Sequence, residues 1–333
     1  MRIIEEPLGG SFFSSPILAE YLQGMRIVAA DIETTGLSPK TAAVILGGAV
    51  IPEGSGRRAI QFFGDSLKDE KELLQRYTAL LTQYDVIVTY NGNRFDIPFL
   101  VQRMKHHGLD PSGLAAMHSL DLYRTLRYHS HLPKILPNLK QKTVEVFLGD
   151  GDSRTDEIDG ARSVELYFEY MGSRGPERER ILGEILLHNR DDIVRLSDML
   201  RILRTLDIHG IMYSDGFPVQ AGGRRLQVSK IKLSSGKLTA EGSAPGTAAD
   251  AVCYGEGYEL AVGAKEKNWK LKVECLKAGS GLAADLQAMN LDTEQLQALG
   301  GYESGYLILK DGDQIRHREA NWLVRTILLR HLK

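Results

Sequence analysis

Two carboxylates lie one residue apart at the end of an apolar run, in the segment MRIVAADIETTG. Residues 25–30 have the length and composition of a buried strand, and residues two apart in a strand project from the same face. Asp31 and Glu33 therefore point together, and two such acids repel each other unless a cation or a shared proton neutralises them. Hard carboxylate oxygens suit Mg²⁺ or Mn²⁺, so the pair predicts half of a metal site. The alternative is a strand that runs into an acidic turn.

A second strand and the helix after it supply another carboxylate. Residues 86–90 form a short apolar run, and Asn91 and Gly92 are typical turn residues. Asp96 then begins a segment of helical periodicity, so a third acid enters at a helix start. Helix capping near the positive end of the helix dipole is the alternative role for Asp96.

The third acid-bearing segment is LLHNRDDIVRL, within residues 177–206, which are rich in helix formers and carry apolar residues at helical spacing. His188 and Asp192 are four residues apart and share one helix face, whereas Asp191 points about a quarter turn away. Asp192 is therefore the better partner for His188. An ordinary His/Asp surface pair is the alternative.

In their order and separation, these motifs resemble those of the DEDD exonuclease superfamily, the DnaQ-like branch of the ribonuclease H fold, over residues 25–206. The segments AVILGGAV, VTYNGNRFDIPFL, SLDLYR and HNRDDI are similar to the YprB-like group. The resemblance implies an α/β fold with a ribonuclease H-like mixed sheet flanked by helices. It also implies a catalytic site of four metal ligands and a histidine, namely Asp31, Glu33, Asp96, Asp192 and His188.

The carboxylates predict a two-metal mechanism, in which two Mg²⁺ or Mn²⁺ ions roughly 3.5–4 Å apart straddle the scissile phosphate. Asp31 is the expected bridging ligand. His188 is the candidate general base, because an imidazole with an ordinary pKa of about 6.5 accepts a proton from water near neutral pH. The resembled histidine subgroup has four residues between its histidine and aspartate, whereas three separate His188 from Asp192. That departure leaves the role of His188 open.

The function implied is a metal-dependent 3′–5′ exonuclease acting on single-stranded 3′ ends, with the polarity taken from the resemblance. The alternatives are a structure-selective endonuclease with the same site, a catalytically silent nucleic-acid-binding protein, or a scaffold. Candidate substrate contacts are Thr34, Asn91 and Phe95, and core packing is the alternative for Phe95. Basic stretches at residues 124–142 and 224–237 offer charge to phosphates, although such runs are often ordinary solvated faces.

Other acids lie between the second and third motifs. Asp121 follows a short strand-like run and is predicted to support the site by hydrogen bonding rather than to bind an ion. Asp156, Glu157 and Asp159 are predicted to form a solvated turn, with substrate gating as the alternative.

The composition favours a cytoplasmic protein of two domains. The chain has 333 residues, 43% hydrophobic and 25% charged, which is enough for two ordinary cores. Cys253 and Cys275 form no CxxC motif, so neither a zinc site nor a disulfide framework is indicated. The N-terminal residues do not resemble a signal peptide, and no apolar run reaches membrane-spanning length, so no membrane partner is expected. A net charge of -2 decides nothing about nucleic acid, which needs only a local basic surface.

The C-terminal residues 212–333 are predicted to form a smaller accessory α+β domain without a catalytic motif, entered through a Gly- and Pro-rich linker at 213–225. NWKLKVECL alternates like a half-buried strand, and residues 306–309 followed by KDGD and QIRHR resemble a hairpin with Asp311 and Gly312 at its turn. The last residues suit a packing helix. Residues 1–24 are predicted to be an N-terminal extension with a short helix and no chemistry.

Overall fold

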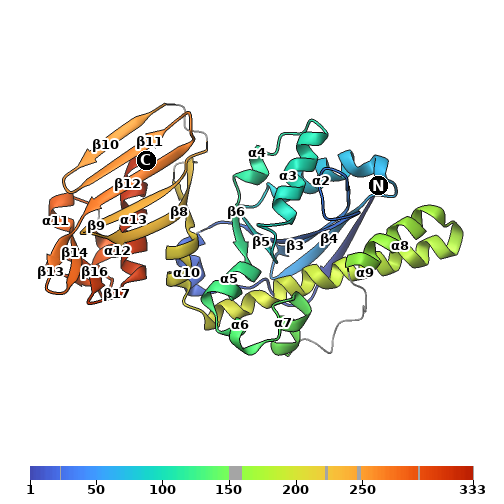
Figure 1. Ribbon diagram of the computed structural model, residues 1–333, viewed down its shortest axis with the longest axis horizontal. Helices are drawn as coiled ribbons and strands as arrows, with labels where there is room; N and C mark the ends of the chain where they lie inside the picture. Colours follow the sequence, from blue (N-terminus) through green and yellow to red (C-terminus); the bar gives the residue numbers. More distant parts are fainter. Residues whose placement is uncertain (23, 150–159, 222–223, 246–248, 292, 333) are drawn as a thin grey trace. The chain divides into compact units, whose positions relative to one another are not determined.

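The structure, a computed structural model, describes residues 1–22, 24–149, 160–221, 224–245, 249–291 and 293–332 (Figure 1). The chain divides into two compact units, Met1–Ser15 with Gly24–Leu206 and Pro16–Gln23 with Asp207–Lys333. The predicted acidic turn at 156–159 lies outside the described residues. Among the residues described, none of the helices has the length and apolar character needed to cross a membrane.

The first unit contains a six-stranded mixed sheet, which confirms the predicted α/β architecture. Its strand order is β1-β4-β3-β2-β5-β6, with β2, β5 and β6 parallel and the other neighbours antiparallel. The strands are β1 (Arg2–Leu8), β2 (Ile27–Thr34), β3 (Val44–Glu53), β4 (Gly56–Phe63), β5 (Val86–Thr89) and β6 (His118–Asp121).

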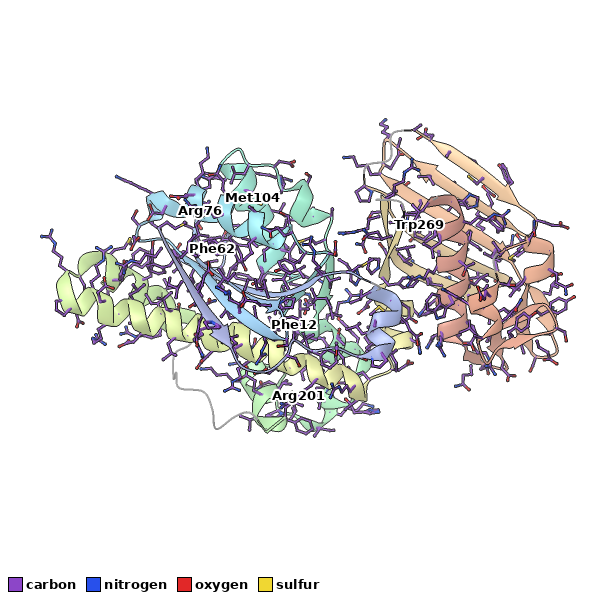
Figure 2. All side chains as sticks on the ribbon, turned by 180° about the vertical axis from the view of Figure 1, so that it is seen from behind. Phe12, Phe62, Arg76, Met104, Arg201 and Trp269 are labelled. Atoms are coloured by element: carbon purple, nitrogen blue, oxygen red, sulfur yellow. The ribbon has the colours of Figure 1, made fainter. Side chains whose placement is uncertain are left out.

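Helices cover both faces of this sheet. They are α2 (Glu70–Leu81), α3 (Asp96–His106), α4 (Ser112–Ala115), α5 (Leu122–His129), α6 (Leu132–Ile135), α7 (Gln141–Phe147), α8 (Gly160–Gly172) and α9 (Gly175–Met199), with 3₁₀ turns at Leu67–Asp69 and Leu200–Thr205. Helices α2 and α3 bury one face in a core that includes Phe62 and Met104, both labelled in Figure 2. Helices α8 and α9 bury the other face against Phe63.

The elements that carry the predicted acids form as expected, with one difference. Strand β2 includes Thr34, which the sequence predicts to break the strand, because Thr34 still pairs with Val44 of β3 after Asp31, Ile32 and Glu33 have paired with it. The two acids are therefore held inside a paired strand. Strand β5 ends at Thr89, and α3 begins at Asp96 as predicted.

The second unit contains two antiparallel sheets with a few helices, which agrees with the predicted α+β class. One sheet has the order β10-β11-β12-β9-β8-β7, and the other β13-β14-β16-β15 with β17 paired to β16. The strands are β7 (Phe217–Ala221), β8 (Arg224–Ser234), β9 (Lys237–Ser243), β10 (Ala251–Gly255), β11 (Tyr258–Gly263), β12 (Asn268–Glu274), β13 (Leu276–Ala278), β14 (Gly281–Asp285), β15 (Tyr302–Glu303), β16 (Tyr306–Asp311) and β17 (Gln314–Ile315). The helices are α1 (Pro16–Leu22), α10 (Ile208–Asp215), α11 (Leu286–Met289), α12 (Glu294–Gln297) and α13 (His317–Leu332).

Three sequence predictions in this unit are confirmed. Strand β12 buries Trp269, labelled in Figure 2, on one face and exposes its lysines on the other. Strands β16 and β17 form the predicted hairpin, with Gly312 at its turn in the left-handed region at φ 55°. The predicted C-terminal helix is α13.

The predicted linker at residues 213–225 is wrong. Helix α10 ends at Asp215, and Gly216 adopts a φ of 88° that terminates it. Pro218 lies in β7, which tolerates it because β7 is the edge strand of its sheet and needs fewer N–H donors.

The predicted N-terminal extension is also not a separate element. Strand β1 pairs with β4 along its full length and completes the edge of the first sheet. Helix α1 belongs to the second unit, where the Tyr21 hydroxyl accepts a hydrogen bond of 2.9 Å from the Asn321 side chain. Residues 1–24 are thus divided between both units because each half has its own packing partner.

Candidate metal centre

A cavity of about 770 Å³ opens where β2 and β5 end, beside α9. Every residue predicted as a ligand, base or substrate contact lines it: Asp31, Glu33, Thr34, Asn91, Phe95, Asp96, His188 and Asp192. These residues come from segments more than 150 positions apart in the sequence. The fold therefore brings all of them to one place.

Asp96 is held against β2 by the backbone. Strand β2 pairs with β5 only as far as Ala29, because β5 ends and the chain turns away. The N–H of Ile32 lies beyond that point, and it donates a hydrogen bond of 3.3 Å to Asp96 Oδ1. The carboxylate thus takes the place of a missing strand partner, which fixes the start of α3 beside Asp31.

The carboxylates of the cavity disfavour one another's charge. Burial raises the pKa of Asp31 well above its ordinary range, and the three neighbouring carboxylates of the cavity raise it further. Burial also raises the pKa of Asp96 to about 7, although backbone hydrogen bonds oppose the shift. A cluster of this kind becomes favourable as fully charged carboxylates only when cations enter it.

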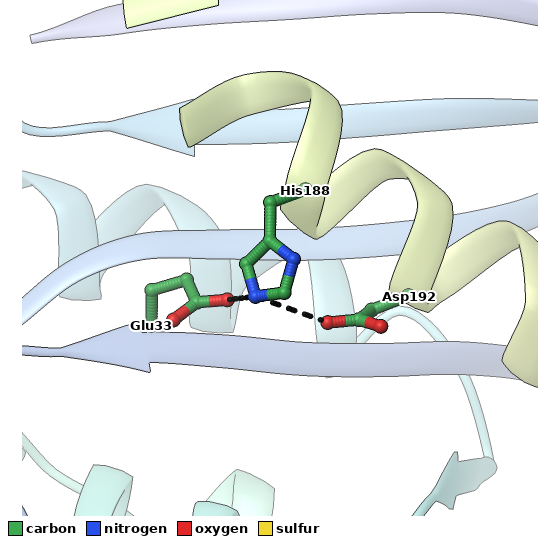
Figure 3. A group of neighbouring side chains, drawn as sticks. All are labelled: Glu33, His188 and Asp192. Carbon is green, nitrogen blue, oxygen red and sulfur yellow. Dashed lines mark ion pairs between the residues drawn. The ribbon is translucent and has the colours of Figure 1, made fainter. Parts of the chain in front are cut away.

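Helix α9 brings His188 and Asp192 to Glu33, as Figure 3 shows. The Nε2 atom of His188 lies 3.5 Å from Glu33 Oε1 and 3.6 Å from Asp192 Oδ2. One ligand atom from each of these three residues lies within 4.8 Å of the others. Two carboxylate oxygens and an imidazole nitrogen at this separation form a donor set that fits a divalent cation.

Asp191 occupies a different position on the same helix. It is buried, pairs with Arg190 at 3.2 Å and does not line the cavity. Helical spacing therefore distinguishes the two adjacent aspartates correctly, and Asp192 is the one that faces the other acids.

Asn189 is a site residue that sequence reasoning missed. It is fully buried, and its Nδ2 donates a hydrogen bond of 3.2 Å to Asp31 Oδ2. Its Oδ1 accepts a hydrogen bond of 3.0 Å from Gln61 Nε2, which also donates a hydrogen bond to the Leu186 carbonyl. A Cβ at Gly48 would overlap Asn189 Oδ1, so glycine is needed in this buried strand. A glycine inside a strand run is the signal that could have indicated a close approach there.

Asp121 supports the site through the turn after β5, in agreement with its predicted role. Its two carboxylate oxygens accept hydrogen bonds from the backbone N–H groups of Asn91 at 2.9 Å and Asn93 at 3.1 Å. It also caps α5 through the Arg124 N–H. Asn91 has a φ of 65°, a left-handed conformation that asparagine tolerates better than most residues.

The three predicted substrate contacts differ in how they are held. The Thr34 hydroxyl donates to the Gly36 carbonyl at 2.8 Å, which fixes the turn after β2. Phe95 lines the cavity and also packs on Phe99, with ring centroids 5.4 Å apart. Leu37, which the sequence did not single out, lines the same cavity with 86% of its surface exposed.

Positive charge reaches the cavity from only part of the basic stretch at 124–142. Lys140 and Lys142 line it together with Gln141. The side chain of Gln141 donates a hydrogen bond of 3.0 Å to the backbone carbonyl of Asp192, and this bond anchors the start of α7 to α9. Two lysines therefore lie in the wall of the cavity that holds the carboxylates.

A family model of known proteins agrees with this architecture. A family model described as the RNase H superfamily matches residues 28–204. A DNA polymerase of Methanocaldococcus jannaschii is 40% identical over 68 residues, which are 20% of this chain and 4% of the polymerase. The structure of the family B DNA polymerase from the archaeon Pyrobaculum calidifontis is similar at a TM-score of 0.41 and 21% identity, over 53% of this chain and 24% of that chain. The matched regions thus cover only a small part of either polymerase.

Proposed function

The chain belongs to the RNase H superfamily, and from that premise we propose that it is a metal-dependent nuclease that hydrolyses phosphodiester bonds as a 3′–5′ exonuclease. One observation carries the proposal: four carboxylates from three separate elements line a single cavity. They are Asp31 and Glu33 of β2, Asp96 of α3 and Asp192 of α9. The proposed subgroup is the DEDD or DnaQ-like type, in its YprB-like form.

The donor set supports Mg²⁺ or Mn²⁺, in two ions, as the cofactor. Asp31, Glu33, Asp96 and Asp192 are the residues that would hold them, and carboxylate oxygens are the ligands these ions prefer. When bound, such ions would supply positive charge at the phosphate and lower the pKa of bound water toward neutral pH. The raised pKa values of Asp31 and Asp96 support this assignment, because burial first and the neighbouring carboxylates second disfavour their charge without a cation.

The protein's own side chains orient the reaction. Asn189 and the Ile32 N–H fix the carboxylates of Asp31 and Asp96, so these groups need little rearrangement when substrate binds. His188 is placed beside Glu33 and Asp192 and accepts a proton from the attacking water. Lys140 and Lys142 neutralise phosphate charge, and Phe95 stacks on a base at the cavity wall.

Single-stranded nucleic acid ends are the proposed substrate. The test uses single strands that carry a label at either the 3′ or the 5′ end, with Mn²⁺ or with a chelator. We expect immediate release of labelled mononucleotide from the 3′ label, and a ladder of shortening products from the 5′ label. The Asp96→Asn protein, which keeps an oxygen for the Ile32 N–H, is the matched inactive control.

Each other outcome contradicts part of the proposal. Internal fragments without mononucleotides would indicate an endonuclease, and mononucleotides released first from the 5′ label would reverse the polarity. Binding of strands without any Mn²⁺-dependent hydrolysis would contradict the enzyme and leave a silent nucleic-acid-binding protein. Hydrolysis that persists in Asp96→Asn would place the chemistry outside this cavity.

A further inference from the structure

The six-stranded sheet of the second unit has one buried face and one exposed face. Along β12, Trp269, Leu271 and Val273 are buried, while the lysines between them are exposed. The neighbouring strands β8 and β9 alternate in the same way, with Ile231 and Leu238 buried. The exposed face is therefore defined by the residues that alternate with this core.

Pairing between the strands gathers lysines on that exposed face. Lys232 of β8 lies opposite Thr239 of β9, which lies opposite Lys272 of β12. In the next row, Lys230 of β8 lies opposite Glu241 of β9, which lies opposite Lys270 of β12. These side chains line a groove of about 270 Å³ whose floor is β9. We call it the lysine groove: Lys230, Lys232, Thr239, Glu241, Lys270 and Lys272.

The acids on this face leave the groove positively charged. Lys230 approaches Glu241 only to 4.0 Å, and Lys272 approaches Glu259 of β11 only to 4.0 Å. Among the residues that the structure describes, Lys232 and Lys270 form no ion pair. A third glutamate of this face, Glu274, pairs with Lys237 at 2.9 Å outside the groove. The four lysines of the groove thus face two glutamates at 4.0 Å or more, and exposed pairs of this kind release their lysines to a stronger anion at little cost.

An exposed aromatic side chain extends the same row of the sheet. Tyr254 of β10 lies opposite Glu259, which lies opposite Lys272. Its side chain is 77% exposed, which is unusual for so large a ring on a paired strand. A flat ring beside a track of positive charge is the combination that holds the bases and the backbone of a single strand.

We propose that the lysine groove binds the phosphate backbone of single-stranded nucleic acid, with Tyr254 stacking on a base. The proposal rests on the proposed nuclease function, which gives the chain a nucleic acid substrate, and adds a second binding surface to it. Lysines two apart on a strand lie about 6.8 Å apart, so they offer a regular series of charges to an extended polyanion. Lysine binds phosphate as a point charge without reading bases, so the groove is not sequence-specific.

Fluorescence anisotropy of labelled oligothymidylate with the full chain tests this inference, in a chelator so that no hydrolysis occurs. We expect the Lys232→Gln, Lys270→Gln double variant to bind about 20-fold more weakly at about 0.1 M salt, and the slope of log affinity against log salt to become shallower by about 1.4. Tyr254→Ala should weaken binding roughly tenfold with an unchanged salt slope.

The matched control is the Lys265→Gln, Lys277→Gln double variant. It removes the same charge from two exposed lysines of the same unit that lie outside the groove. Equal losses from both double variants, or no loss from either, would overturn the proposal. Tighter binding of duplex, or equal competition by polyglutamate, would also overturn it, because the occupant would then be a duplex or an acidic protein.

This experiment separates the inference from the proposed function. If the wild type never hydrolyses a phosphodiester, the nuclease proposal fails while the binding result in the chelator still stands. If hydrolysis depends on Asp96 but the groove variants bind single strands like the wild type, the groove proposal alone fails.

Discussion

The side-chain amide of Asn189 donates a hydrogen bond to Asp31, the acid at the centre of the carboxylate cluster. Gln61 in turn donates to Asn189, and Gly48 leaves the space that Asn189 occupies. A buried amide thereby fixes one oxygen of Asp31 and leaves the other oxygen for a cation. The relationship connects α9 to β2, β3 and β4 at the point where the cavity lies.

Replacing Asn189 by alanine should therefore loosen Asp31. We expect Mn²⁺ affinity and hydrolysis to fall by about tenfold to a hundredfold, as is typical when a hydrogen-bond partner of a metal ligand is removed. Titration calorimetry gives the affinity, and a thermal melt shows whether the protein remains folded. Gln83→Ala, an exposed amide of the same unit, is the control. Unchanged Mn²⁺ affinity in a folded Asn189→Ala protein would limit Asn189 to a packing role.

The Asp31→Asn protein should lose activity and gain stability. Burial and neighbouring charges raise the pKa of Asp31, so removing its charge relieves repulsion in the metal-free protein. The amide can still accept the hydrogen bond from Asn189 through its oxygen. We expect a higher melting temperature than the wild type in a chelator, together with loss of hydrolysis in Mn²⁺. A lower melting temperature in the chelator would show that the charge of Asp31 is stabilising.

The raised pKa of Asp96 predicts how the stability of the metal-free protein depends on pH. Its pKa is about 7 in the folded chain against an ordinary value of 3.8, so between these values the folded state binds more protons than the unfolded state. The free energy of unfolding must then fall as the pH rises through this window. Chemical denaturation at pH 5.5 and 7.5 should show a loss for the wild type that is smaller for Asp96→Asn. Equal changes in both proteins would contradict the assigned shift.

His188 is tested by separating rate from metal affinity. If His188 is the general base, its replacement by glutamine should lower the hydrolysis rate by about 10²- to 10⁴-fold and leave the Mn²⁺ affinity unchanged. His106→Gln, an exposed histidine on α3, is the control. A matching fall in Mn²⁺ affinity would instead make the imidazole a ligand, as its position between Glu33 and Asp192 also permits.

Local sequence patterns predict the elements that build the cavity. The strand with Asp31 and Glu33, the helix start at Asp96 and the choice of Asp192 over Asp191 all follow from the repeat of a strand or a helix. Each depends on neighbours within a few residues. These features are therefore readable without tertiary information.

Structural features that depend on residues distant in the sequence cannot be predicted from local patterns. Strand β1 is an edge strand in which no position is fully buried, and half-buried positions alternate with exposed ones. Its sequence therefore shows no clear alternation of apolar and polar residues. Asn189 looks like any polar helix residue until β3 approaches it at Gly48. Pro218 suggests a linker, yet an edge strand accommodates it.

Mn²⁺ titration of the wild type and its four single amide variants tests whether the four carboxylates form one divalent metal centre. The variants are Asp31→Asn, Glu33→Gln, Asp96→Asn and Asp192→Asn. We expect saturable binding of two ions by the wild type, with affinity lost in every variant. If the wild type takes up no Mn²⁺, or if the four variants bind it as the wild type does, the four carboxylates do not form a metal centre.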